Sequence, residues 1–423
     1  MGGLSFKLST WQLMGMLKLC RLMLLLLLAQ YYGGIRCNCL DSQNLLKTRV
    51  DESSPSLCSA FVSPYGYPCE EYTVLTKDGF FLGVQRISGG QASVHRNHSK
   101  PPVVLQHGLL QGGDCWVLNP PGQSLGFVLA DAGYDVWIAN GRGTQWSRHN
   151  EYYSVNEKEF WDWSWDELAA YDLPAVLTFV YNTTASQLFY VGHSQGTIIG
   201  LAALTQPKVI DMVAAAALLS PITYLDHITS KFLHRAASMY IDKLVKTMGL
   251  QEFNLRNNIG VEFVDLVCAS EDVDCGNLLT AITGPNCCFN NSRIPYYLQY
   301  EPQSTSLKNM QHLAQMVRTG TFAKFDYGFF GNVWHYFSPS PPSYDLFNIP
   351  KSFAMWMASG GNDYLSDPED IKHTISEIVC HPRMLFLKDY GHIDFILSTR
   401  AKEDLYDDLI SFFGSKTASA AIR

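Results

Sequence analysis

Short apolar runs alternate with helical stretches along most of the chain, and this alternation predicts the fold. Six runs have the length and composition of buried strands: "PPVVLQHGLL", "GYDVWIANGRG", "SQLFYVGHS", "VAAAALLSPI", "SFAMWMASGG" and "RMLFLKDYGH". Helical stretches lie between them, among them "SLGFVLADAG", which Gly133 closes, and "SWDELAAYDLPAVLTFVYN". Strands that are apolar on both faces and are joined through helices form parallel sheets. We therefore expect an α/β fold with a mostly parallel central sheet flanked by helices.

Two departures from this alternation complete the expected organisation. Ahead of the runs, β-rich stretches on either side of Asp78-Gly79 predict an antiparallel hairpin. Between "LLSPITY" and "NIPKSFAMW", about 120 residues contain no convincing parallel strand, which is too many for a simple connecting loop. We expect a core formed by residues 35–222 and 346–415, an inserted helical cap over 223–345, and a tail over 416–423.

The N-terminus has the pattern of a targeting segment. Three basic residues precede the uncharged run "LMLLLLLAQYYGGI" over 22–35. A membrane-spanning helix needs about 20 apolar residues, so this run is too short and also turns polar at Gln30. The pattern favours a cleaved signal peptide over residues 1–34 above a signal anchor. Cleavage would change the net charge from −8 to −11.

Entry into the secretory pathway makes disulfides the expected state of paired cysteines. Cys58 and Cys69 flank a turn rich in Pro and Gly, while Cys268, Cys275, Cys287 and Cys288 form a cluster that allows three pairings. Metal binding is the competing interpretation, but no His/Cys pairing with zinc-finger spacing accompanies these cysteines. We expect no metal site.

The glycosylation sequons bear on the compartment of the protein, and the charge distribution bears on its binding partners. Asn97, Asn182 and Asn290 each begin an Asn-x-Ser/Thr sequon, which agrees with secretion. The formal charge comes from 31 basic and 39 acidic residues without a block of like charge. Because nucleic-acid binding needs a concentrated basic face, we expect no nucleic-acid partner.

One short motif carries the chemistry. Gly192-His193-Ser194-Gln195-Gly196 follows the predicted strand "LFYVG" and precedes the predicted helix "TIIGLAALTQ". This strand–turn–helix context is that of a nucleophile elbow, in which the flanking glycines stand where a Cβ atom would clash. The helix N-terminus favours negative charge developing near Ser194. Ser194 is therefore the candidate nucleophile.

A serine nucleophile needs a base and a group that orients the base. His392 follows the last predicted strand, and Asp363 follows the strand before it on a Gly-rich loop, in the chain order Ser, Asp, His. The other acidic candidates nearby are Asp367, Asp389 and Asp394, and Asp363 lies nearest a strand end.

Acyl transfer also needs two backbone N–H groups that stabilise the oxyanion. One N–H group is expected from Gln195, the residue after the nucleophile. The second is expected from Leu109, in the loop "QHGLL" after an early strand. His107 and Gly108 are expected to shape this loop.

With these residues assigned, the chain resembles the acid lipase family of α/β-hydrolases, which includes gastric and lysosomal acid lipases and a plant triacylglycerol lipase branch. The resemblance runs from Tyr67 to Phe413 through "LQHGLL", "LADAGYDVWIANGRGTQWSRHN", "FWDWSWDELAAYDLPA", "YVGHSQGT", "STSLKNMQHLAQM", "FDYG", "GGNDYLSD" and "YGHIDF". "FWDWSWDELA" and "NCCFN" are most similar to the plant branch. The cysteine pattern departs from the animal members.

The resemblance implies an α/β-hydrolase fold and the same site residues that spacing nominates. Ser194 would be the nucleophile, Asp363 the acid and His392 the base, with Leu109 and Gln195 as oxyanion donors. Family members need no cofactor, are glycosylated, and are secreted or delivered to acidic compartments such as a lysosome or vacuole. They hydrolyse triacylglycerols or cholesteryl esters.

The resemblance also implies a helical cap inserted between the sheet strands before Asp363, in agreement with the long segment without a parallel strand. Within it, "FLHRAASMYIDKLVKTMG" predicts an amphipathic helix whose apolar face either covers the core or contacts lipid; that face holds Leu233, Ala237, Tyr240, Ile241, Leu244 and Met248. An open acyl groove would be an aggregation hazard in water, so part of residues 224–345 is expected to move at an oil surface.

The sequence and the resemblance together thus predict a secreted serine lipase that hydrolyses the ester bonds of triacylglycerols through an acyl-enzyme and contacts the lipid–water interface transiently. A steryl ester hydrolase or an acyltransferase would use the same machinery. A ligand-binding protein without catalysis would be expected to lack part of the triad, and all three residues are present here.

Overall fold

The computed structural model describes residues 55–91, 100–240, 251–256, 258–268 and 277–420. The expected signal peptide, the sequon at Asn97 and Cys275 lie outside these residues. Among the residues that are described, no helix has both the length and the apolar character needed to cross a membrane.

Nine strands of the described chain form the main sheet, eight of them in the order β1-β2-β4-β3-β6-β7-β10-β11, with β5 beside β2. From β4 onward along this order the neighbouring strands pair in parallel, whereas β2 pairs antiparallel with β1, β4 and β5. The strands are β1 (Cys69–Leu75), β2 (Phe80–Ile87), β3 (Pro102–Gln106), β4 (Asp135–Ala139), β5 (His149–Asn150), β6 (Leu188–His193), β7 (Val213–Leu219), β10 (Ala354–Gly360) and β11 (Arg383–Leu387). The mostly parallel sheet predicted from the apolar runs is confirmed.

The sheet is covered on both faces because successive side chains of its strands point to opposite sides. In β3, Val104 packs into one apolar cluster while Val103 and Leu105 pack into the other. In β4, Trp137 and Ile138 divide in the same way. All these residues are buried, which explains why the strands are continuous apolar runs rather than alternating ones.

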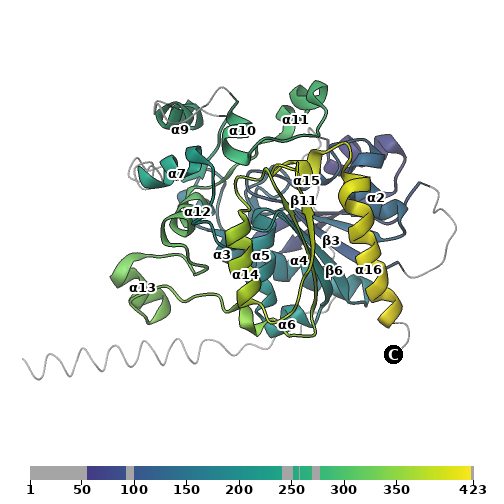
Figure 1. Cartoon of the computed structure of the whole chain (residues 1–423). Helices are drawn as coiled ribbons and strands as arrows, with labels where there is room; N and C mark the ends of the chain where they lie inside the picture. The colour runs from purple at the N-terminus through teal and green to yellow at the C-terminus, as the bar shows by residue number, and fades with distance from the viewer. Residues whose placement is uncertain (1–54, 92–99, 241–250, 257, 269–276, 421–423) are drawn as a thin grey trace, which may run out of the picture. The chain divides into compact units, whose positions relative to one another are not determined.

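Helices complete the two layers (Figure 1). α2 (Leu125–Asp131) and α16 (Asp407–Ala420) cover one face, and α4 (Leu173–Thr184), α5 (Gln195–Leu204) and α14 (Pro368–Glu377) cover the other. Shorter helices connect these elements: α3 (Trp165–Glu167), the π-helical turn η6 (Leu168–Asp172), α6 (Pro207–Ile210) and α15 (Asp394–Leu397). α16 continues beyond residue 415, where the C-terminal tail was expected to begin.

Local chemistry fixes the turns of this core. The hairpin between β1 and β2 turns at Gly79, whose φ of 89° suits glycine. Gly133, with φ of 95°, ends α2 as predicted. Ser164 and Glu167 form a capping box at the start of α3, and η6 and α4 continue the chain from there.

Between β7 and β10 the described residues add no strand to the main sheet. They form α7 (Lys231–Ser238), α9 (Asn258–Cys268), α10 (Leu278–Thr283), α11 (Ile294–Tyr300), α12 (Leu307–Thr319), α13 (Gly328–Tyr336) and the antiparallel pair β8 (Glu252–Phe253) and β9 (Thr305–Ser306). In Figure 1, α7, α9, α10, α12 and α13 lie on one side of the sheet layers.

The predicted amphipathic helix is shorter than its sequence pattern. α7 ends at Ser238, whose hydroxyl donates to the carbonyl of Arg235, and Tyr240 has a φ of 49° that no regular helix continues. Residues 241–250, which include Ile241, Leu244 and Met248, lie outside the described chain. The described apolar residues Leu233 and Ala237 line a cavity under the helix.

Disulfides join two pairs of the described cysteines. Cys58 and Cys69 form the bridge suggested by the turn between them. In the cluster of four, Cys287 and Cys288 pair with each other, which selects one of the three open possibilities. Cys268 is also disulfide-bonded.

Candidate active site

The motif around Ser194 folds as the predicted sharp turn between β6 and α5. Ser194 has a φ of 54°, a conformation that costs a non-glycine residue about 1–3 kcal/mol. A Cβ atom on Gly192 would lie 2.7 Å from the carbonyl oxygen of Gly196, and one on Gly196 would lie 2.5 Å from that of Gln106. Both glycines are therefore required where the chain crosses itself closely, and the turn presents a buried hydroxyl at a sheet edge.

Three sequence-predicted side chains meet at this turn. His392 Nε2 lies 2.7 Å from Ser194 Oγ, and His392 Nδ1 lies 3.0 Å from each carboxylate oxygen of Asp363. All three residues are buried. They follow the C-terminal ends of β6, β10 and β11, which meet at one edge because these strands are parallel.

Ser220 joins this chain of hydrogen bonds and was not nominated from the sequence. It follows β7 directly, is fully buried and has a φ of 52°. Its hydroxyl donates to Asp363 Oδ2 and lies 2.6 Å from His392 Nδ1. The only signal in the sequence is a serine at the end of the run "VAAAALLS".

The carboxylate of Asp363 is held in its ionised form. Burial works to raise its pKa, but the charge and hydrogen bond of His392, with further hydrogen bonds from Ser220 and the Ser366 N–H, hold the pKa below its usual value. The backbone N–H groups of Leu365 and Ser366 donate to Oδ1 at 2.9 and 3.0 Å. A fixed, charged carboxylate can orient the imidazole and stabilise its protonated form.

Of the three competing acids, two stabilise local backbone structure and the third is exposed. Asp367 caps α14 by accepting from the Glu369 N–H. Asp394 accepts from the N–H groups of Gly391, Cys287 and Cys288 and so fixes the loop that carries His392. Asp389 follows β11 and is exposed.

The loop after β3 covers the nucleophile. A Cβ atom on Gly108 would lie 2.9 Å from Ser194 Cβ, so only glycine fits there. The loop is fixed by His107 Nε2, which accepts from Gly141 N–H at 2.9 Å, and by Gln111 Oε1, which accepts from Gly108 N–H at 3.0 Å. Leu109 lies in the same loop and lines the cavity around Ser194.

The inner neighbours of Ser194 are tied to other loops. His193 Nε2 lies 3.0 Å from the carbonyl oxygen of His392, and burial, followed by the nearby His392, lowers the pKa of His193 to about 3. The Gln195 side chain exchanges hydrogen bonds with Asn309 of α12. Its backbone N–H stands at the first position of α5, where helix N–H groups have no partner inside the helix.

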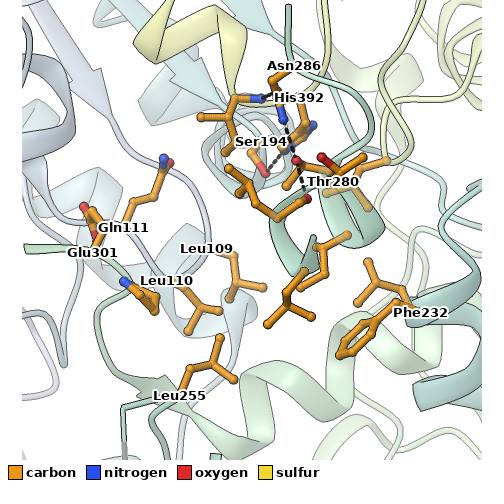
Figure 2. Close-up of a pocket in the computed structure, with 18 of the residues that line it drawn as sticks. Leu109, Leu110, Gln111, Ser194, Phe232, Leu255, Thr280, Asn286, Glu301 and His392 are labelled. Carbon is orange, nitrogen blue, oxygen red and sulfur yellow. Dashed lines mark hydrogen bonds between the residues drawn. The ribbon is translucent and has the colours of Figure 1, made fainter. Parts of the chain in front are cut away.

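An apolar cavity of about 810 Å³ opens beside these groups. Figure 2 shows Ser194 and His392 at one end, with Leu109, Leu110, Phe232 and Leu255 around the remaining space. The other lining side chains are mostly leucine, isoleucine and similar residues from α7, α10, α11 and α12. Such a lining suits an acyl chain next to a polar reaction centre.

Two acids lie at one wall of the cavity: Asp114, which is buried, and Glu301, which is half-buried and lines the cavity. Asp114 Oδ2 and Glu301 Oε2 have no hydrogen-bond partner, and burial raises the pKa of Asp114 to about 6 and that of Glu301 well above its usual value. Glu301 also accepts from the Gly112 N–H, while the Gln303 N–H donates to the Leu110 carbonyl. These contacts anchor the loop that holds Leu109, and no pattern in the sequence indicates them.

Within the described parts of the chain, two clusters have ligand atoms spaced closely enough for a metal ion: Cys287, Cys288 and Asp394, and Asp226, His227 and Asp370. The cysteines of the first are joined to each other, so their thiolates are not available. In the second, His227 Nδ1 lies 2.6 Å from Asp370 Oδ1. Neither supplies a group to the chemistry at Ser194.

The chain is similar to known lipases over most of its length. The model of the partial α/β-hydrolase lipase region matches residues 58–120, and that of the α/β hydrolase fold matches 101–399. Triacylglycerol lipase 1 of Arabidopsis thaliana is 50% identical, with 89% of this chain and 95% of that protein covered. Gastric triacylglycerol lipase of Bos taurus is 38% identical, with 84% and 90% covered.

Solved structures agree on the fold. A soluble variant of monoglyceride lipase from Saccharomyces cerevisiae superposes with a TM-score of 0.53 at 14% identity, with 84% of this chain and 99% of that chain covered. The long match to the family model and the identities to its relatives lead to one conclusion: the chain belongs to the acid lipase family of α/β-hydrolases, a family of carboxylic ester hydrolases.

Proposed function

We propose that the protein hydrolyses the ester bonds of triacylglycerols through an acyl-enzyme formed on Ser194. The observation that carries the proposal is the hydrogen-bonded series from Ser194 Oγ through His392 to Asp363 at the end of an apolar cavity. The names of the relatives, triacylglycerol lipases of plant and animal origin, support the same substrate class.

The reaction follows from these positions. Ser194 Oγ attacks the ester carbonyl carbon while its proton passes to His392 Nε2, and the imidazolium is stabilised by Asp363. The alcohol leaves as its C–O bond breaks and takes that proton. Water then attacks the acyl-enzyme by the same route, which releases the fatty acid and restores the hydroxyl of Ser194. The backbone N–H groups of Leu109 and Gln195 stabilise each oxyanion.

The cap and the route of the protein belong to the same proposal. Residues 223–345 form a cap, part of which opens at an oil surface, and residues 1–34 direct the chain into the secretory pathway. Secretion, or delivery to a vacuole or lysosome-like compartment, agrees with the disulfide between Cys58 and Cys69. Asn182 and Asn290 are exposed, as glycosylation requires.

Replacing Ser194 with Ala tests the chemistry. Triolein hydrolysis should fall by about four orders of magnitude or more, because the nucleophile carries the covalent step, while the circular dichroism spectrum stays unchanged. Ser376→Ala, an exposed serine on α14, is the matched control and should keep full activity. A fluorophosphonate should label the control variant and not Ser194→Ala. Substantial turnover by Ser194→Ala would end the proposal.

Two further measurements test the lid and the substrate class separately. Activity on an ester assayed across its solubility limit should jump if a lid opens, and a smooth curve would contradict the lid. Product analysis with triolein, a cholesteryl ester and a competing alcohol should give mainly free fatty acid from triolein. Preferred steryl ester cleavage or transfer to the alcohol would replace the substrate assignment while leaving the Ser194 chemistry in place.

A further inference from the structure

Helix α13 exposes an apolar face to solvent, which reverses the usual arrangement of a surface helix. Phe329, Phe330, Val333 and Trp334 fall within an arc of roughly 140° when successive helical residues are about 100° apart. Phe337, directly after the helix, adds a fifth apolar side chain. Phe330, Trp334 and Phe337 are 86%, 82% and 94% exposed. These five residues are called the apolar face of α13.

The opposite side of α13 is fixed to the protein by polar contacts. Asn332 is buried and bonds Asp326, the Tyr327 N–H and the Pro339 carbonyl. The ring of His335 stacks on that of Tyr327 at 3.8 Å, and the Tyr336 hydroxyl donates to the Phe325 carbonyl. The helix is therefore held in one orientation, and the exposure of its apolar face is a property of the folded protein.

The charge distribution around this face selects the kind of partner. Residues 327–344 contain no Asp, Glu, Lys or Arg. The residues on either side of this segment are Asp326 and Asp345, which are exposed and negatively charged. Lys324 is half-buried and turned toward the ring of Tyr336 on the inner side. Because the chain has an overall charge of −8, an anionic surface would repel this region. An uncharged surface would not, and it suits a segment without charged side chains.

The shape of the face favours lipid over a second protein. Phe330, Trp334 and Phe337 are each more than 80% exposed, and the ring of Phe330 lies edge-on to that of Phe329, so the rings form a raised apolar surface. Protein–protein anchor residues instead fill well-packed pockets on the partner. A lipid surface adapts to projecting rings, and Trp and other aromatic side chains are enriched at membrane interfaces. We propose that α13 anchors the protein to uncharged lipid surfaces by inserting Phe330, Trp334 and Phe337.

The position of the anchor is connected to the cavity. Phe325, which accepts the hydrogen bond from Tyr336, packs edge-on against His312 of α12. Met310 and Leu313 of the same helix line the cavity. In Figure 1, α13 also lies on the same side of the sheet layers as α7 and α12. Adsorption through α13 needs no catalysis, so this inference goes beyond the proposed function and can be tested apart from it.

The test is adsorption to phosphatidylcholine vesicles and to phosphatidylcholine-coated triolein droplets, measured by flotation. The full chain with Ser194→Ala is used, so that no lipid is consumed. Combining Phe330→Ser, Trp334→Ser and Phe337→Ser should weaken adsorption at least tenfold. The matched control combines Leu75→Ser, Tyr152→Ser and Phe386→Ser, which are 51%, 66% and 60% exposed elsewhere, and should stay within twofold of the parent.

In the active background, both sets of variants should hydrolyse a dissolved short-chain ester at the parent rate, which shows that they fold. Adsorption of the α13 variant at the parent level would overturn the inference. So would adsorption that requires anionic lipid in the vesicle. A third outcome would also overturn it: the parent sediments as a dimer, the α13 variant sediments as a monomer, and both adsorb equally to lipid. The apolar face of α13 would then bind a second copy of the chain.

Discussion

Removing the hydroxyl of Ser220 tests whether the fourth group beside the Ser194–His392–Asp363 series takes part in positioning it. The hydroxyl contacts both His392 Nδ1 and Asp363 Oδ2, so it can stabilise the imidazolium–carboxylate pair while the proton resides on the imidazole. Ser220→Ala keeps the backbone and removes only this group. Ser220→Gly also removes it, and in addition relieves the strain of a φ of 52°.

The magnitude follows from one charge-assisted hydrogen bond. Such a bond contributes about 1.5–3 kcal/mol, which corresponds to a decrease in kcat of about 10- to 100-fold. The direct contact between His392 and Asp363 at 3.0 Å remains, and so do the two backbone N–H groups on Asp363, so a larger loss is not expected. KM should stay unchanged, because Ser220 is not among the residues that line the cavity.

The assay is steady-state hydrolysis of a dissolved ester together with urea unfolding. Ser124→Ala is the matched control, since Ser124 is also buried and its hydroxyl donates to the Asn119 carbonyl, away from the site. It should lose about 1 kcal/mol of stability and keep its kcat. If both Ser220 variants keep the parent kcat, or lose only as much kcat as Ser124→Ala, Ser220 has no positioning role.

Three further predictions concern the frame of the site. Gly196→Ala should lower kcat by about 100-fold, because the backbone clash displaces Ser194, and a parent-like rate would contradict the turn geometry. Replacing Cys58 and Cys69 with Ser should cost about 2–3 kcal/mol in urea unfolding at unchanged kcat, since their bridge spans 11 positions. Asp114 has a folded-state pKa of about 6, above its unfolded value, so its protonation stabilises the fold at low pH and this stabilisation is lost as pH rises from about 4 to 6. Asp114→Asn should therefore reduce the parent's loss of stability between pH 4 and pH 7 by about 1–3 kcal/mol, and an unchanged difference would refute the assignment.

The sheet and the meeting of Ser194, Asp363 and His392 could be predicted because both depend on local patterns. A strand buried on both faces must be a continuous apolar run, and parallel strands bring the residues after them to one edge. A glycine pair around a serine is needed wherever the turn crosses itself, as Gly192 and Gly196 do. The sequence places Cys58 and Cys69 on either side of one short turn but leaves their pairing open, and the structure joins them in a bridge.

The features that escaped prediction depend on contacts between distant segments. Ser220 reaches Asp363 only because β7 and β10 are neighbours in a register where the Ser220 N–H donates to the Ala358 carbonyl. The loop that carries the Cys287–Cys288 disulfide is likewise held by a distant residue, because both N–H groups donate to Asp394. A period-3.6 pattern likewise marks an apolar face without saying whether it is buried: on α7 it lines the cavity, and on α13 it faces solvent.

The protonation states around the cavity explain how the site can combine an apolar lining with charge separation. His193 lies with its ring 5.0 Å from that of His392, so a positive charge there would oppose the imidazolium of the proposed mechanism. Burial, with the neighbouring His392, lowers the pKa of His193 to about 3, and burial raises that of Glu301, so both remain neutral in mild acid. In the proposed mechanism, a positive charge on His392 would then be opposed by no fixed cation among the described lining residues and would be balanced by Asp363 behind it. In a poorly solvated cavity this pairing is stronger than in water, so a neutral neighbourhood favours both acyl-chain binding and proton transfer.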